Sequence, residues 1–183
     1  MNNSMDKKYF GIDLKDCKFI GKGRQGSVYL LPDKKRIIKI YNKEKGCKGE
    51  AEILLKVQND PHFAKIYDYT NKAMIREYIP GECIKDYIRK HGLSRELAIN
   101  LVKLVESFKA DGFKKLDIRL AHVYVQTDGD VRVIDPRKVF ERSLSYPRSI
   151  FKDLKKLSVL SKFMRIVQED YPDLYKQWNK RRK

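Results

Sequence analysis

The chain has 183 residues, and its 41 lysine and arginine residues against 24 aspartate and glutamate residues give a formal charge of +17. This length suits one compact domain or two small lobes, and it excludes a large multidomain enzyme. Hydrophobic residues make up 42% of the chain and aromatic residues 11%, which is enough to fill a core and argues against wholesale disorder. The basic excess predicts attraction to polyanions such as nucleotide phosphates, nucleic acid or anionic lipid.

The cysteines and the apolar runs bear on the cellular compartment. Cys17, Cys47 and Cys83 form no C-x-x-C pair, so neither a zinc ribbon nor a disulfide framework is indicated. No uninterrupted apolar run approaches the roughly 20 residues that span a bilayer. The N-terminus lacks the apolar region of a signal peptide. We therefore expect a reduced, cytoplasmic protein with no membrane span.

Strand-forming runs dominate the first 80 residues. Strands are expected at 18–20, 27–31, 36–41, 63–69 and 73–79. Between the third and fourth of these runs, apolar residues at helical spacing predict a helix over 49–58. Pro80 and Gly81 then break the chain and mark a boundary between two lobes.

The second part of the chain is mainly helical. Residues 82–111 and 148–180 are expected to be helical, and a hairpin of two short strands, 123–125 and 131–134, lies between them. The last segment places Ile150, Leu154, Leu157, Met164 and Val167 on one helical face. Strands first and helices later predict an α+β fold. We expect one domain, 1–183, with lobes of about 1–79 and 80–183.

A glycine-rich motif, G-x-G-x-x-G-x-V, occupies residues 21–28. Glycines let backbone amides approach phosphate oxygens, because no Cβ stands in the way. In a dinucleotide-binding fold a helix would follow the motif, whereas here the composition favours a strand. The motif therefore predicts a hairpin that covers nucleotide phosphates. Its candidate binding residues are Gly21, Gly23, Gly26 and Val28.

Lys39 lies between two isoleucines on the strand 36–41 and points away from both. One interpretation is an exposed strand lysine. The other is a cation for the α- and β-phosphates of a nucleotide, held by a carboxylate of the helix that follows. Glu50 lies on the same side of that helix as Leu54, whereas Glu52 is expected to face solvent.

With these parts in this order, the sequence resembles the protein kinase fold. The resemblance covers about residues 18–136 and implies two lobes, a strand-rich N-lobe and a reduced helical C-lobe. Its hinge pattern falls on residues 75–81, so adenine would bond to backbone groups of Glu77 and Ile79. Arg76 takes the gatekeeper position, where a long charged side chain is unusual. The shortened C-terminal part is similar to the small atypical kinases of microbes.

The catalytic-loop pattern of the family, H-R-D-L-x-x-x-N, resembles residues 115–122. The resemblance gives Asp117 the position of the catalytic base. It gives Arg119 the position of a basic residue that faces the γ-phosphate. His122 stands where the family has an asparagine that binds metal, and an imidazole is a poorer ligand than an amide oxygen for Mg²⁺.

The metal-binding aspartate of the family resembles Asp135, which makes Asp135 and His122 the implied metal ligands. Pro136 and Arg137 replace the Phe-Gly that normally follows. The catalytic residues implied by the resemblance are Asp117, Arg119, Lys39 and Glu50.

The resemblance implies an ATP-dependent phosphotransferase that uses Mg²⁺ and moves the γ-phosphate to a Ser or Thr hydroxyl of a protein or of the chain itself. Two alternatives stay open. A nucleotide-binding pseudokinase or scaffold is favoured by Arg76, His122 and the Pro136-Arg137 pair. A basic RNA-associated kinase-like protein is suggested by the charge of +17, although no RNP-like aromatic motif is present.

Overall fold

The computed structural model describes residues 8–112, 118–136 and 146–180. The chain divides into two compact units. The N-terminal unit is Met1–Gln58 with Ala64–Tyr78, and the C-terminal unit is Asn59–Phe63 with Ile79–Lys183. Within the described residues, no helix has both the length and the apolar character needed to cross a membrane.

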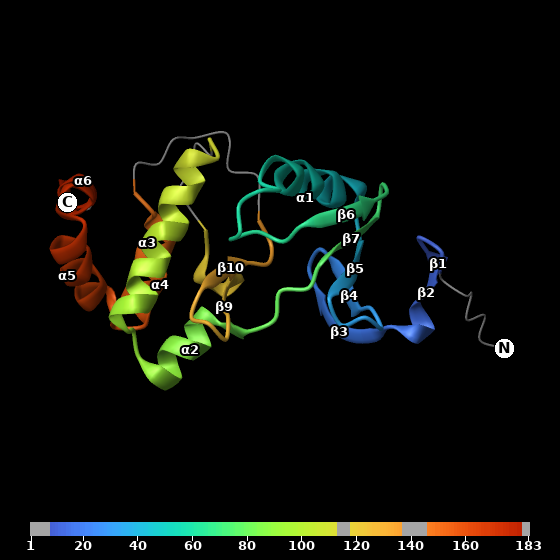
Figure 1. Ribbon diagram of the computed structural model, residues 1–183, viewed down its shortest axis with the longest axis horizontal. Coiled ribbons are helices and arrows are strands. Elements are labelled where there is room, and N and C mark those ends of the chain that lie inside the picture. Colours follow the sequence, from blue (N-terminus) through green and yellow to red (C-terminus); the bar gives the residue numbers. More distant parts are fainter. Residues whose placement is uncertain (1–7, 113–117, 137–145, 181–183) are drawn as a thin grey trace. The chain divides into compact units, whose positions relative to one another are not determined.

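Among its described residues, the N-terminal unit contains a five-stranded antiparallel sheet and one α-helix (Figure 1). Its elements are β1 (Lys8–Tyr9), β2 (Ile12–Asp13), a 3-10 turn (Leu14–Asp16), β3 (Lys18–Gly23), β4 (Gly26–Leu30), β5 (Arg36–Tyr41), α1 (Glu44–Lys56), β6 (Ile66–Tyr69) and β7 (Ala73–Glu77). The strand order of the sheet is β3-β4-β5-β7-β6. The mostly strand-forming first part that the sequence predicts is therefore present.

The two faces of this sheet are covered by different segments. On one face Leu31, Ile38 and Ile75 are buried beneath the segment 9–17, which contributes half-buried apolar side chains. The other face contacts α1, which lies alongside β6 and β7 in Figure 1. Side chains on a strand alternate between the faces, so Lys39 lies on the α1 side, opposite to Ile38.

Helix α1 begins at Glu44, five residues before the predicted start at Gly49. The two glycines in its first turns, Gly46 and Gly49, weaken the helical pattern of the sequence. Burial of Cys47 against the sheet outweighs that weak propensity, because tertiary contacts supply most of the stability of a helix in a protein.

The C-terminal unit combines a small sheet with five helices among its described residues. Its elements are β8 (Glu82–Cys83), α2 (Ile84–His91), α3 (Arg95–Ala110), a 3-10 turn (Leu120–His122), β9 (Val123–Val125), β10 (Val131–Val133), α4 (Arg148–Lys156), α5 (Leu160–Asp170) and α6 (Pro172–Lys180). The sheet has the order β10-β9-β8, and β9 and β10 form the predicted hairpin. Ser94 caps α3, since its hydroxyl accepts the Leu97 N–H at 3.0 Å.

The segment 148–180 is three helices, so the prediction of one continuous apolar face was wrong. Ser158 has a φ of +60° in the left-handed region, and this conformation separates α4 from α5. The helices are held together by an aromatic cluster instead. The ring of Trp178 lies 5.4 Å from that of Phe151 and 6.3 Å from that of Phe163, between ring centroids.

Candidate active site

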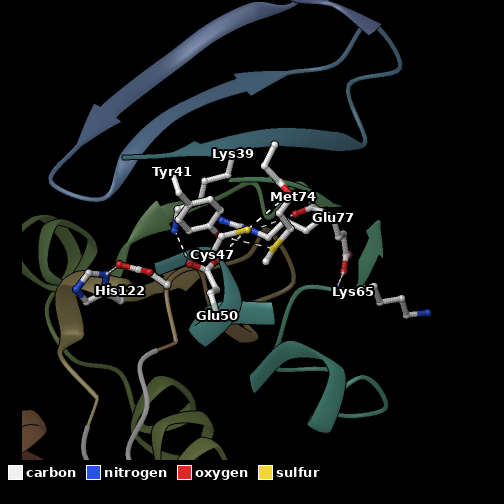
Figure 2. Close-up of polar contacts among 11 residues, drawn as sticks. Lys39, Tyr41, Cys47, Glu50, Lys65, Met74, Glu77 and His122 are labelled. Carbon is white, nitrogen blue, oxygen red and sulfur yellow. Dashed lines mark hydrogen bonds and ion pairs between the residues drawn. The ribbon is translucent and has the colours of Figure 1, made fainter. Parts of the chain in front are cut away.

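Lys39 and Glu50 form a buried ion pair in the N-terminal unit (Figure 2). The Lys39 Nζ donates to Glu50 Oε2 at 2.5 Å, and the two residues are 6% and 3% exposed. Strand β5 supplies the lysine and α1 the glutamate. Glu52, by contrast, is exposed. Isolated charges are costly to bury, and the ion pair offsets part of that cost for both side chains.

Arg76 joins this pair from β7. The register of β5 and β7 pairs Lys39 with Met74, and Arg76, two residues further along, lies on the same face. Its Nε lies 3.6 Å from Glu50 Oε1, and the residue is only 6% exposed. Its Nη1 also donates to the Glu77 carbonyl at 3.2 Å. Lys39, Glu50 and Arg76 thus form one buried charged cluster. The sequence pattern does not reveal the contact between Arg76 and Glu50.

Two further side chains of the cluster are neutral. The Lys39 Nζ lies over the Tyr41 ring, 4.9 Å from its centroid. Burial is the main cause that raises the pKa of the Tyr41 phenol, and the nearby charge of Glu50 is the second. The same two causes raise the pKa of the Cys47 thiol to about 11. That thiol donates to the Thr70 carbonyl at 3.2 Å. At neutral pH, Tyr41 and Cys47 therefore bring no charge to the cluster.

The glycine motif forms a hairpin between β3 and β4, and a strand follows it rather than a helix. A Cβ placed on Gly21 or Gly23 would have no described atom of the protein within 4 Å. A Cβ on Gly26 would lie 1.8 Å from the Ile40 carbonyl oxygen. Gly26 is thus required for the close approach of β4 to β5, whereas Gly21 and Gly23 have room beside them. Val28, also predicted to bind nucleotide, is half-buried on β4 and pairs with Lys39.

The predicted hinge residues fall in both units. The Glu77 N–H donates to the Lys65 carbonyl at 2.8 Å, and the Glu77 carboxylate accepts the Lys65 N–H at 3.1 Å. These bonds fix the end of β7 beside the start of β6, as Figure 2 shows. Ile79 belongs to the C-terminal unit and is 4% exposed.

Those predicted site residues of the C-terminal unit that the structure describes lie around or beside its short 3-10 turn. Asp117, the predicted base, falls outside the described residues. Arg119 is exposed and immediately precedes the turn. His122 and Asp135 are brought together, with Nδ1 3.6 Å from Oδ2. The Ile134 N–H also donates to the His122 carbonyl at 3.0 Å. This backbone hydrogen bond holds the residue before Asp135 next to His122.

Of the two predicted metal ligands, Asp135 is a suitable ligand for Mg²⁺ and His122 is a poor one. Magnesium in nucleotide sites takes one or two carboxylates and completes its shell with substrate phosphates and water. The Asp135 carboxylate suits that coordination, whereas the imidazole of His122 suits softer metals. No cluster of three or more His, Cys, Asp or Glu side chains that could hold a metal occurs in the part of the chain that the structure describes.

Asp153 is a structural anchor that the sequence reasoning missed. Its Oδ2 accepts the Leu120 N–H at 3.2 Å and so fixes the 3-10 turn against α4. One feature of the sequence could have indicated this role: Asp153 lies among the apolar residues of α4, between the buried Phe151 and Leu154. A half-buried carboxylate there needs a polar partner.

Two comparisons with known proteins bear on the fold of the chain. No model of a known protein family matches the chain. The chain is 27% identical over 125 residues to "Putative serine/threonine-protein kinase YrzF" of Bacillus subtilis (strain 168), a match that covers 66% of this chain and 58% of that relative. Among solved structures, it is similar to the Cydia pomonella granulovirus kinase PK-1, with a TM-score of 0.51 and 19% identity.

The structural match covers 67% of this chain and 51% of PK-1. The chain therefore spans little more than half the length of either kinase. The element order of both units, the buried Lys39–Glu50 pair and the two matches lead to one conclusion. The chain has a protein kinase-like fold with a strand-rich N-terminal part and a helical C-terminal part.

Proposed function

We propose that the chain is an ATP-dependent phosphotransferase that transfers the γ-phosphoryl group to a Ser or Thr hydroxyl of a protein or of the chain itself. The observation that carries this proposal is the buried Lys39–Glu50 ion pair. A lysine held at 2.5 Å by a glutamate of the adjacent helix is the arrangement that binds the α- and β-phosphates in protein kinases.

The N-terminal unit binds and orients the nucleotide in this proposal. Lys39 contacts the α- and β-phosphates, and Glu50 fixes its ammonium group. Backbone amides at Gly21 and Gly23 approach the phosphates, where the structure leaves room for them. Backbone groups of Glu77 and Ile79 bond the adenine. Holding the phosphates in place removes much of the entropic part of the barrier.

The C-terminal unit supplies the groups for the transfer step. Asp117 orients the attacking hydroxyl and accepts its proton as the oxygen bonds to the γ-phosphorus. The bond from that phosphorus to the β–γ bridging oxygen breaks, and ADP leaves. Arg119 offsets the charge on the transferred group. Asp135 would hold Mg²⁺, which neutralises phosphate charge when bound, and His122 lies beside Asp135.

Transfer of label from γ-labelled ATP to the chain or to a general protein acceptor tests this function. We expect transfer by the parent and its loss in Lys39→Met and in Asp117→Asn. Lys35→Met is the matched control, because Lys35 is an exposed lysine just before the same strand. Label in the parent equal to that in both variants would refute the proposal.

A nucleotide-binding scaffold is the second candidate, and the imidazole at His122 favours it. The same variants separate the two candidates. A scaffold binds MgATP through Lys39 and transfers nothing, so binding without label selects it. The proposed unit is a single kinase-like domain over 1–183. The three cysteines are free thiols, which agrees with the proposed cytoplasmic location.

A further inference from the structure

Three of the buried polar or charged side chains gather in one cluster. Among the described residues, the buried polar or charged side chains are Lys39, Glu50, Arg76 and Asn100. Lys39 and Arg76 each form an ion pair with the Glu50 carboxylate. Removing a charge from water costs several kcal/mol per ion, so a second cation at this carboxylate is a costly feature that calls for a reason.

The two cations contact different oxygens of Glu50. Lys39 binds Oε2, and the Nε of Arg76 lies 3.6 Å from Oε1. They therefore do not compete for one acceptor, and together they restrict rotation of the carboxylate. The Nη1 of Arg76 donates at the same time to the Glu77 carbonyl. Arg76 thus connects the glutamate of α1 to the backbone at the end of β7.

Helix α1 has a second attachment to the same part of the sheet one turn earlier. The Cys47 thiol lies 3.2 Å from the Thr70 carbonyl oxygen and 3.6 Å from that of Ala73, across the β6–β7 turn. Cys47 and Glu50 lie three residues apart and so occupy the same face of α1. Two successive turns of the helix therefore contact the β6–β7 hairpin, one through the hydrogen bond of Cys47 and the other through the ion pair of Glu50 with Arg76.

We propose that Arg76 is a positioning residue that holds Glu50, and with it α1, in the Lys39-paired position before any nucleotide binds. Its role in catalysis rests on the phosphotransfer function proposed above, because Arg76 acts on the phosphates only through Glu50 and Lys39. Its role in fixing α1 does not depend on that function.

Hydrogen exchange of α1 without nucleotide tests the positioning role. In Arg76→Met we expect amide exchange across 44–56 to rise by about tenfold, because one of the two ionic anchors of Glu50 is lost. Exchange in β4 should stay unchanged, which separates local release of α1 from general destabilisation. Arg36→Met is the matched control, since Arg36 lies on the neighbouring strand in an exposed ion pair with Asp33. Unchanged α1 exchange in Arg76→Met would overturn the proposal.

A double-mutant cycle shows whether Arg76 acts through Glu50. In the Glu50→Gln background, Arg76→Met should raise α1 exchange by less than about twofold, since the partner is already neutral. A full tenfold rise in that background would overturn the proposal. If Arg76→Met does not fold, Arg76→Lys replaces it in both experiments. Lysine keeps the charge but lacks the guanidinium, so an intermediate rise is expected, and parent-like exchange would overturn the proposal.

Turnover separates failure of this proposal from failure of the proposed function. In an active enzyme, Arg76→Met should lower kcat by about tenfold at a temperature where all variants are folded, with Arg36→Met unchanged. A chain that transfers no phosphate but shows the α1 effect refutes the phosphotransfer function and keeps the positioning role. A chain that transfers phosphate with parent-like kcat in Arg76→Met refutes the role of Arg76 in catalysis, whereas its role in fixing α1 is decided by the exchange experiments.

Discussion

Cys47 lies fully buried on the sheet side of α1, one turn before Glu50. Burial and the charge of Glu50 raise the pKa of its thiol to about 11, so it is protonated at pH 8. We expect iodoacetamide at pH 8 to leave Cys47 unmodified in the folded protein and to modify it in denaturant. Cys83, which is half-buried, is the internal reference. Mass spectrometry of the peptides measures both, and native labelling of Cys47 as fast as Cys83 would contradict the structure.

Asp60 makes stability depend on pH in acid. Burial would raise the pKa of Asp60, but hydrogen bonds from the ring and the backbone N–H of His62, and one with Asp111, outweigh it and lower the pKa to about 2. The unfolded value is about 3.9. The contribution of Asp60 is therefore complete above about pH 4 and is lost as the pH falls through about 2.

The test compares the parent with Asp60→Asn in urea unfolding from pH 7 to pH 2. We expect the difference in unfolding free energy between them to be constant at neutral pH. It should then shrink by about 2 kcal/mol between pH 4 and pH 2. A difference that does not change over that range would show that the pKa of Asp60 is not lowered by folding.

Some of the residue contacts in the candidate site could be predicted from sequence, and others could not. The choice of Glu50 over Glu52 follows from helical spacing, since a residue three or four positions from Leu54 shares its side of the helix. The contact of Arg76 with Glu50 depends on the register of β5 against β7, which no local pattern specifies. The pairing of His122 with Asp135 depends likewise on the register of a hairpin.

At the scale of elements, the glycines of the β3–β4 hairpin have two different roles: Gly26 allows close packing of strands, whereas Gly23 has open space beside it. Gly26→Ala should lower the free energy of unfolding by more than about 2 kcal/mol, because its Cβ would overlap the Ile40 carbonyl oxygen. Gly23→Ala should change stability by less than about 0.5 kcal/mol, since its Cβ meets no described atom within 4 Å. Urea unfolding measures both. Equal losses in the two variants would mean that β4 does not approach β5 as described.

The elements themselves were mostly predictable, and their ends were not. Alternating and helical patterns place the five main strands of the N-terminal unit and the β9–β10 hairpin close to their observed positions. The early start of α1 was hidden by Gly46 and Gly49, whose low propensity is overcome by packing. The break at Ser158 was hidden because a left-handed residue other than glycine leaves no composition signal.

At the scale of the whole molecule, the proposed function draws residues from both units. Lys39 and Glu50 belong to the N-terminal unit, whereas Asp135 and the predicted base Asp117 belong to the C-terminal unit. The sequence order of these parts predicted the kinase-like fold, because few folds place such charges in that succession of strands and helices. The phosphoacceptor could not be predicted, since no sequence motif of the chain indicates a particular substrate.

The central proposal is that binding of MgATP requires both Lys39 and Asp135, and thermal unfolding with and without MgATP tests it most directly. A ligand at 100 times its Kd stabilises the folded state by about 2.7 kcal/mol, which corresponds to a rise in Tm of roughly 5–10 °C for a chain of this size. We predict that rise in the parent and in the control Lys35→Met, and its loss in both Lys39→Met and Asp135→Ala. Parent-like rises in both site variants would contradict the account.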